Sequence, residues 1–238
     1  MTIKAVFFDA AGTLIRPVRR VGESYALTAR KYGMEAPAEE IGQRFRSCFS
    51  SAPPLAFPGA QARELKGLER QWWEELVRRV FEPYGPFPRF EDYFSELFSY
   101  FGRPDSWSLY PETVETLAAL KERGLILDVL SNFDSRLIGI LDGLGIASCF
   151  DSVLLSSHVG YAKPAPEIFQ AALGLHQLNA EEALHVGDSL DKDAAGANSA
   201  GMMGVLLDRN NRSGLNSFRR VQSLKEILSF LASTPVQS

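Results

Sequence analysis

An aspartate stands where the first apolar run of the chain ends. The run Ile3 to Phe8 leads directly to Asp9, and the turn Ala10-Ala11-Gly12-Thr13 follows it. A carboxylate at the end of a buried strand, beside a turn that glycine permits, can serve as a nucleophile or as a metal ligand. Alone, the pattern is better explained by an aspartate that orders a turn. Its chemical meaning therefore depends on the other polar residues of the chain.

Three further groups of polar residues each stand beside a predicted strand or helix end. They are Ser131-Asn132, Lys163-Pro164 and the run from Gly187-Asp188 to Asp193. A phosphoryl group that is attacked in line needs a nucleophile, a metal ion that neutralises its oxygens, and hydrogen-bond donors around them. Lys163 and Asp193 read singly are surface charges, but the joint pattern favours one site.

The carboxylates suit a magnesium ion, which prefers an octahedral shell of oxygen ligands. We expect Asp9 to attack phosphorus and also to bind Mg²⁺, with Asp188 as the second carboxylate ligand. The backbone carbonyl of Ala11 and water would complete the shell, and Asp193 would orient or supplement it.

The substrate would be held by one cation and several hydrogen-bond donors. We expect Lys163 to contact both the nucleophilic carboxylate and the phosphoryl oxygens. The remaining donors would be the Ser131 hydroxyl and backbone N–H groups near Ala10, Ala11 and Asn132.

Short apolar runs alternate with helical patterns and must position these residues. The predicted strands are Ile3 to Phe8, Leu125 to Leu130, Ser152 to Leu155, Ala183 to Val186 and Met203 to Leu207. The predicted helices between the later strands are Glu112 to Arg123, Asp134 to Leu144, Pro164 to Leu173 and Asp191 to Ala200. This order predicts an α/β fold with an open parallel sheet, helices on both faces, and a ligand site beyond the carboxyl ends of the strands.

One long segment interrupts the alternation. Between about Arg16 and Asp105 the chain has helical patterns and no convincing strand. The expected helices are Gly22 to Tyr32, Ala38 to Ser50, Gln61 to Phe81 and Phe90 to Phe101. We therefore predict a core formed by residues 1–15 and 106–238 and an inserted helical cap of residues 16–105, with Trp72 and Trp73 in the interior of the cap.

The four polar groups, in this order, resemble the motifs of the haloacid dehalogenase superfamily: D-x-D-G-T, a Ser or Thr, a Lys, and G-D-x-x-x-x-D. The resemblance spans Phe7 to about Leu207, and the helical insert is similar to the cap that some members carry after the first motif. More narrowly, Arg70-Gln71-Trp72-Trp73 and Leu130-Ser131-Asn132-Phe133-Asp134 look like the subgroup related to the rhythmically expressed gene 2 product. The resemblance implies a Rossmann-like core and a Mg²⁺-dependent hydrolase that uses Asp9, usually a phosphatase of a small phosphorylated compound.

The chain departs from this pattern at Ala11. In the family's phosphatases this position holds an aspartate that protonates the leaving alcohol and then activates water. A methyl group can do neither, and a positioned general acid/base is worth about 10²- to 10⁴-fold in rate. We therefore expect weak activity, a leaving group that departs easily, as an acyl or aryl phosphate would provide, or a proton supplied by another group or by water.

Three alternatives to this phosphatase stay open. Phosphonoacetaldehyde hydrolases of the superfamily also carry alanine here and use a cap lysine, for which Lys31 and Lys66 are the candidates. A dehalogenase-like reaction would share Asp9 but needs no metal, although Asp188 and Asp193 are retained. A catalytically impaired domain could bind a phosphorylated ligand or a protein without turning it over.

Composition limits the partners and the location. The net charge of −4 gives no broad positive field for nucleic acid, so only a local patch such as Arg16, Arg19 and Arg20 could attract an anion, and we suggest that one of them reaches the substrate. No apolar stretch approaches a membrane span, the N-terminal run is too short for a signal peptide, and two cysteines are too few for a disulfide framework. We expect a cytoplasmic protein with no nucleic-acid or membrane partner, and the sequence assigns no oligomeric state.

Overall fold

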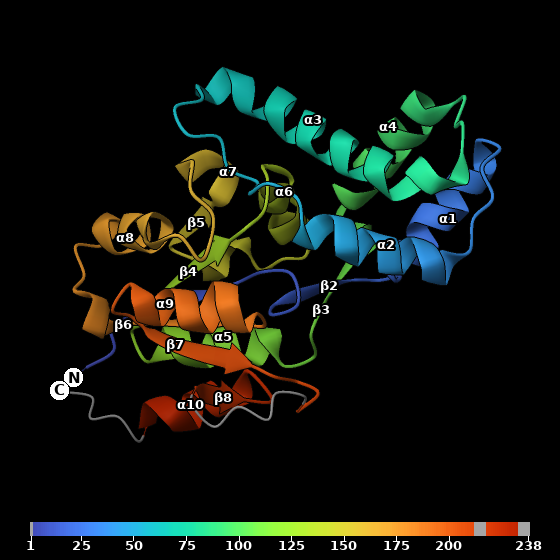
Figure 1. Ribbon diagram of the computed structural model, residues 1–238. Coiled ribbons are helices and arrows are strands. Elements are labelled where there is room, and N and C mark those ends of the chain that lie inside the picture. Colours follow the sequence, from blue (N-terminus) through green and yellow to red (C-terminus); the bar gives the residue numbers. More distant parts are fainter. Residues whose placement is uncertain (1, 212–217, 233–238) are drawn as a thin grey trace.

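A six-stranded parallel sheet forms the core of the computed structural model, which describes residues 2–211 and 218–232 (Figure 1). The strands are β1 (Ala5–Phe8), β4 (Ile126–Ser131), β5 (Ser152–Leu155), β6 (Ala183–Gly187), β7 (Met203–Leu207) and β8 (Arg219–Val221). Their order is β5-β4-β1-β6-β7-β8, with each neighbouring pair parallel. The predicted α/β fold and its five strands are confirmed, and β8 is an additional edge strand that the sequence pattern did not indicate.

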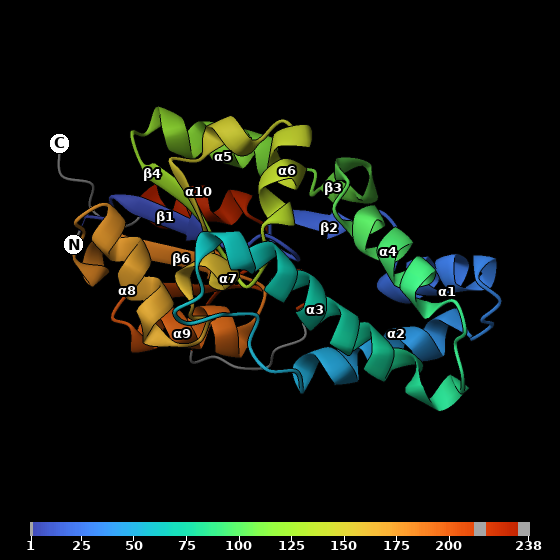
Figure 2. The same ribbon diagram turned by 90° about the horizontal axis from the view of Figure 1, so that it is seen from above.

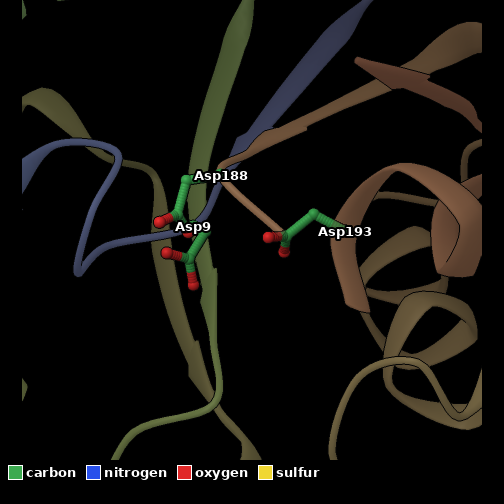
Figure 3. Close-up of side chains that lie close together, drawn as sticks. All are labelled: Asp9, Asp188 and Asp193. Carbon is green, nitrogen blue, oxygen red and sulfur yellow. The ribbon is translucent and has the colours of Figure 1, made fainter. Parts of the chain in front are cut away.

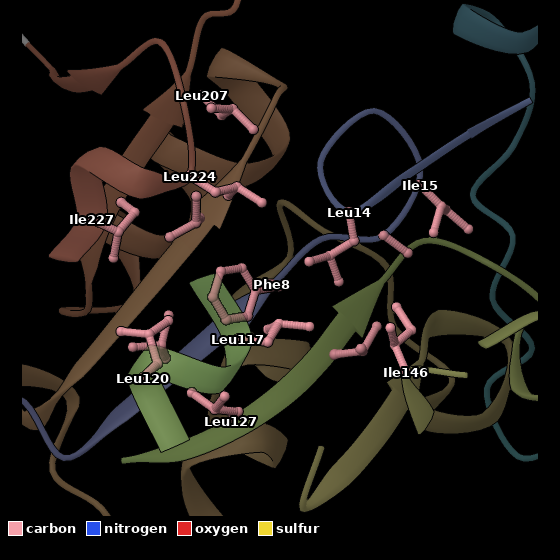
Figure 4. Close-up of a cluster of buried hydrophobic side chains, with 14 of the residues drawn as sticks. Phe8, Leu14, Ile15, Leu117, Leu120, Leu127, Ile146, Leu207, Leu224 and Ile227 are labelled. Carbon is pink, nitrogen blue, oxygen red and sulfur yellow. The ribbon is translucent and has the colours of Figure 1, made fainter. Parts of the chain in front are cut away.

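Both faces of this sheet are covered by helices, as Figure 2 shows from above. The side chains of β1 alternate, so that Val6 and Phe8 enter the apolar cluster on one face and Ala5 and Phe7 enter the cluster on the other. The first cluster, part of which is drawn in Figure 4, takes its helical residues from α5 (Thr113–Glu122), α6 (Arg136–Gly143) and α10 (Lys225–Ala232). The second takes them from α8 (Pro166–Leu175) and α9 (Gly196–Ser199). Burial on both faces explains why the strands appear in the sequence as continuous apolar runs.

Four helices between the short strands Ile15–Pro17 and Trp107–Leu109 build a third apolar cluster, outside the sheet. They are α1 (Val21–Lys31), α2 (Ala38–Ser50), α3 (Ala62–Phe81) and α4 (Phe90–Phe101), each within one residue of its predicted bounds. Their interior is aromatic, with Tyr93, Phe94 and Phe81 almost fully buried. Figure 1 shows this helical insert beside the carboxyl end of the sheet.

The insert and the core are joined by a two-stranded antiparallel ribbon. β2 (Ile15–Pro17) pairs with β3 (Trp107–Leu109), so the chain enters and leaves the insert side by side. The expectation that the segment from Arg16 to Asp105 contains no strand is therefore wrong at its first residues. Three-residue strands are too short to show a periodicity of their own, and the pairing partner lies about ninety residues away.

Three helix starts also differ from the prediction, and α6 is the first of them, since it begins at Arg136 rather than Asp134. α8 begins at Pro166 rather than Pro164, and either proline suits a first helical turn. The helix expected from Asp191 is a π-helical segment, Leu190–Ala195, that continues into α9. Short elements complete the chain: α7 (Ser156–Val159) and the 3₁₀ turns Glu82–Tyr84, Pro104–Ser106, Ala147–Cys149 and Ala180–Glu182. Within the described ranges, no helix is long and apolar enough to cross a membrane.

Candidate active site

Asp9 stands at the carboxyl end of β1, between the ends of its two neighbours. Its backbone N–H donates to Val186 at the end of β6, while Ser131 ends β4 on the other side. Its carboxylate oxygen Oδ1 accepts hydrogen bonds from the Ser131 hydroxyl over 3.1 Å and from Lys163 Nζ over 2.9 Å. Both bonds end on Oδ1, which leaves Oδ2 as the candidate attacking atom.

Lys163 is buried, and every donor of its ammonium group has a partner. Nζ contacts Asp9 Oδ1, the Leu130 carbonyl over 2.7 Å and Asp193 Oδ1 over 2.6 Å. Asn132 fixes the backbone of this lysine, because its side-chain amide donates to the Lys163 carbonyl and accepts from the Lys163 N–H, each over 2.8 Å. Although burial opposes the charged form, Asp193 and Asp9 raise the pKa of Lys163 and so favour its charged form.

Asp9, Asp188 and Asp193 converge at this sheet edge (Figure 3). One carboxylate oxygen from each lies within 4.8 Å of the other two. Glycine permits the approach at two positions. Gly12 has a φ of +100°, and a Cβ there would lie 2.3 Å from Asp188 Oδ2; a Cβ at Gly187 would lie 2.1 Å from Asp193 Cγ. A larger residue at either position would displace an acidic side chain.

Asp193 is already fully engaged by protein donors. Its Oδ1 is 2.6 Å from Lys163 Nζ and 2.9 Å from His185 Nε2, and its Oδ2 accepts from the Ser189 N–H over 2.9 Å. Burial opposes ionisation, but Lys163 and His185 together hold the pKa of Asp193 well below its usual range. This geometry suits a residue that orients Lys163 better than a direct metal ligand.

The other two carboxylates carry negative charge that the protein leaves unbalanced. Burial, partly offset by Lys163, raises the pKa of Asp9. Asp188 is exposed where it lines the cavity, and desolvation by the surrounding protein together with repulsion from Asp9 and Asp193 raises its pKa to about 7. Three carboxylates around one ammonium leave a surplus of two negative charges when all are ionised. Hard oxygen donors with this surplus fit a divalent cation such as Mg²⁺, and Asp9 and Asp188 are the residues that could hold it.

A cavity of about 430 Å³ opens over these residues. All but one of the site residues predicted from the sequence line it: Asp9, Ala11, Ser131, Asn132, Lys163, Asp188 and Asp193. Ala10 is the exception, since the residue is fully buried and packs into the core. The Ala11 methyl group faces the space in which the sequence motif would place a carboxylate.

Of the other basic residues considered from the sequence, namely Arg16, Arg19, Arg20, Lys31 and Lys66, only Arg16 lines this cavity. Arg19 and Arg20 line an adjoining cavity of about 980 Å³, which Arg16 also borders. Lys31 contacts Glu96 on the outside of the insert and Lys66 is exposed, so neither lysine reaches the acidic cluster. An anion contact by Arg16 stays a prediction.

Two residues near the site were not recognised from the sequence as part of it. One is His185, whose buried ring contacts Asp193 over 2.9 Å. Trp73 was assigned to the interior of the cap, but it lines the cavity, and its indole N–H donates to Asp134 of the core over 2.6 Å. The alternation of residues in β6 indicates which face His185 takes, but only the packing of elements decides what lies beside it.

The fold and the acidic cluster define a hydrolase-type α/β protein, and comparison with known proteins gives its family. The family model for haloacid dehalogenase-like hydrolases matches residues 3–201, so the chain belongs to that family. It is 36% identical over 210 residues to the haloacid dehalogenase-like hydrolase domain-containing protein 3 of Homo sapiens, covering 87% of this chain and 82% of that protein. It is 31% identical over 235 residues to a phosphoserine phosphatase of Thermus thermophilus, covering 88% and 90% of the two chains. The crystal structure of a dehalogenase superposes with a TM-score of 0.73 at 25% identity and 97% coverage of both chains.

Proposed function

We propose that this protein is a Mg²⁺-dependent phosphatase of a small phosphorylated metabolite that acts through an aspartyl-phosphate at Asp9. The observation that carries the proposal is the set of groups around the Asp9 carboxylate. Its Oδ1 is held by Ser131 and Lys163, and Asp188 provides a second oxygen donor beside it. Because the acidic cluster could hold a divalent cation, it fits a metal-dependent phosphatase reaction better than the metal-free, dehalogenase-like reaction. The relationship to a phosphoserine phosphatase supports the same reaction class.

The residues of the chain divide the proposed reaction between them. Asp9 Oδ2 attacks phosphorus, while Lys163 holds the other Asp9 oxygen and offers its positive charge to the phosphoryl group. Ser131 and the backbone N–H groups of the turn after Asp9 donate hydrogen bonds to the phosphoryl oxygens. A bound Mg²⁺ would neutralise part of the phosphoryl charge. Lys163 keeps its proton because its pKa is raised, and Ala11 has none to give. The reaction therefore depends on a leaving group that departs without general acid catalysis.

The proposal also covers the division into domains, the subgroup and the kind of substrate. Residues 16–105 would form a cap over a hydrolase core of residues 1–15 and 106–238. The kinship with the subgroup related to the rhythmically expressed gene 2 product is supported by contact between its two motifs, since Trp73 of one donates to Asp134 of the other. The protein would act in the cytoplasm on a small phosphorylated compound and would bind neither nucleic acid nor membranes.

Hydrolysis of p-nitrophenyl phosphate and acetyl phosphate, with Mg²⁺ or with EDTA, tests the proposal. We expect turnover only with Mg²⁺, and a loss of at least about 10³-fold in Asp9→Asn. Asp191→Asn is the matched control, because Asp191 is an exposed aspartate of the π-helical segment that also carries Asp193, and it does not line the cavity. Turnover that survives EDTA or Asp9→Asn would contradict the proposal. Chloride release from 2-chloropropionate without phosphate release would favour the dehalogenase-like alternative, and phosphate-ester binding without turnover would favour the impaired binding domain.

A further inference from the structure

The wall of the active-site cavity that faces away from the carboxylates is aromatic. Phe45 and Phe49 come from α2, Trp73 from α3, Trp107 from β3, and Phe133 from the loop after β4. Among the described residues, the only acidic side chains that line the cavity are the three of the cluster, Asp9, Asp188 and Asp193. Arg16 and Lys192 line it as well, and Lys192 Nζ lies 5.3 Å from the centroid of the Phe49 ring. The cavity thus combines an ionic floor with a mainly aromatic wall.

This aromatic wall continues into a smaller cavity of about 80 Å³ between the insert and the core. Both cavities are bordered by Pro17, Val21, Phe45, Trp73, Trp107 and Phe133. Within residues 2–211 and 218–232, Arg136 is the one charged side chain that borders the inner cavity, and its guanidinium is already bound to Asp134 and to the Phe98 carbonyl. A polar group placed there would lose its hydrogen bonds to water without replacement, whereas an apolar group would gain contacts.

The wall is held in place by its own contacts. The bond to Asp134 fixes the Trp73 ring, and Phe49 stacks on Trp73 at a centroid distance of 6.1 Å and an interplanar angle of 24°. Trp107 packs edge-on against Phe133 at 5.7 Å. A wall that is ordered before the ligand arrives loses little side-chain entropy on binding.

Two independent features therefore favour the same kind of leaving group. The wall favours an apolar one, and Ala11 favours one that departs without a proton. We propose that the substrate is a phosphate ester or anhydride whose leaving group is a small apolar phenol or aromatic acid. The ring of the leaving group would lie against Phe49 and Trp73. This inference rests on the proposed function.

The bonds made and broken balance in this reaction. Asp9 Oδ2 forms a bond to phosphorus, and the bond between phosphorus and the aryl or acyl oxygen breaks. The leaving group departs as an anion with the bonding electron pair and takes a proton from solvent. Water then attacks phosphorus, the bond to Asp9 breaks, and inorganic phosphate and a regenerated carboxylate result. The net change is hydrolysis, and no oxidant or further reactant is needed.

Binding of two phosphonates that cannot be hydrolysed tests the subsite separately from turnover. Calorimetry with Mg²⁺ should show that benzylphosphonate binds at least about tenfold more tightly than methylphosphonate, the effect expected for burying an aromatic ring. Phe49→Ser should reduce this preference to less than about threefold, while Phe49→Leu should retain most of it. Phe87→Ser is the matched control, because Phe87 packs inside the insert and borders neither cavity.

The outcomes separate this inference from the proposed function. Equal binding of the two phosphonates, or a preference that survives Phe49→Ser, would overturn the apolar subsite even if p-nitrophenyl phosphate is hydrolysed. Absence of binding by both phosphonates would overturn it as well. A benzyl preference that depends on Phe49, found without any hydrolysis, would support the subsite and refute the phosphatase.

Discussion

Trp73 of the helical insert donates its indole N–H to the fully buried Asp134 of the core over 2.6 Å. Arg136 pairs with the same carboxylate and lies over the Trp73 ring at 5.3 Å. One helical turn earlier, the buried Glu69 accepts hydrogen bonds from Ser135 and Ser157 of the core. Helix α3 is therefore attached to the core by two buried carboxylate contacts, and one of them fixes a ring that lines the active-site cavity.

Replacing Trp73 by phenylalanine should impair both stability and catalysis. The indole bond to a charged acceptor is worth about 1.5–3 kcal/mol, and misplacement of the cavity wall should lower kcat/KM by up to about 10²-fold. Urea unfolding and p-nitrophenyl phosphate kinetics measure the two effects. Trp72→Phe is the control, since the Trp72 indole donates to Pro53 within the insert. Equal kinetic losses in both variants would show that the contact with Asp134 has no specific role.

Magnesium affinity should fall in acid because a proton competes for Asp188. The pKa of Asp188 is raised to about 7 by desolvation and by the neighbouring carboxylates. Below that pH the metal must displace a proton, so its apparent Kd should rise by about tenfold per pH unit. Calorimetric titration with Mg²⁺ over a series of pH values from acid to mildly alkaline measures this slope. A Kd independent of pH across that range would refute the assignment of Asp188 as a ligand.

Asp188→Asn should stabilise the metal-free protein and abolish stabilisation by Mg²⁺. Because the folded-state pKa of Asp188 lies above its unfolded value, its ionisation opposes folding, and the stability of the metal-free protein falls as pH rises from the unfolded pKa towards about 7. After allowance for its exposure to the cavity, removal of this charge should raise the Tm in EDTA at mildly alkaline pH by about 2–4 °C, equivalent to about 1 kcal/mol. Mg²⁺ should raise the Tm of the natural protein and of Asp191→Asn, but not that of Asp188→Asn. A lower Tm of Asp188→Asn in EDTA would contradict the charge imbalance at the site.

Ala11→Asp should restore a general acid selectively for poor leaving groups. The side chain at this position faces the cavity beside Asp9, so a carboxylate there could protonate an alkoxide. We expect phosphate esters of aliphatic alcohols to gain up to about 10²-fold in kcat/KM, while acetyl phosphate, whose leaving group needs no proton, should change little. Ala11→Asn keeps the size of the new side chain without its acid and serves as the control. A similar gain in both variants would show that size, rather than proton transfer, is responsible.

The sequence by itself determined the α/β class, five of the six core strands, the four helices of the insert and the set of candidate residues around Asp9. The inferences about strands and helices succeeded because they rest on local patterns: buried strands appear as apolar runs, and helices show their periodicity and their ends. Ala11 was also visible as a departure from the motif without any coordinates.

Only the tertiary structure decided which side chains share a space. In the structure, Lys163 donates to three acceptors, and Asp193 contacts His185 as well as Lys163. Trp73, which the sequence assigned to the interior of the insert, lies in the cavity wall and contacts the core. The ribbon of β2 and β3 could not be predicted from the sequence, because its two strands lie about ninety residues apart in the chain. Such contacts join elements that are distant in sequence, and their geometry depends on how whole helices pack against the sheet, which no local pattern encodes.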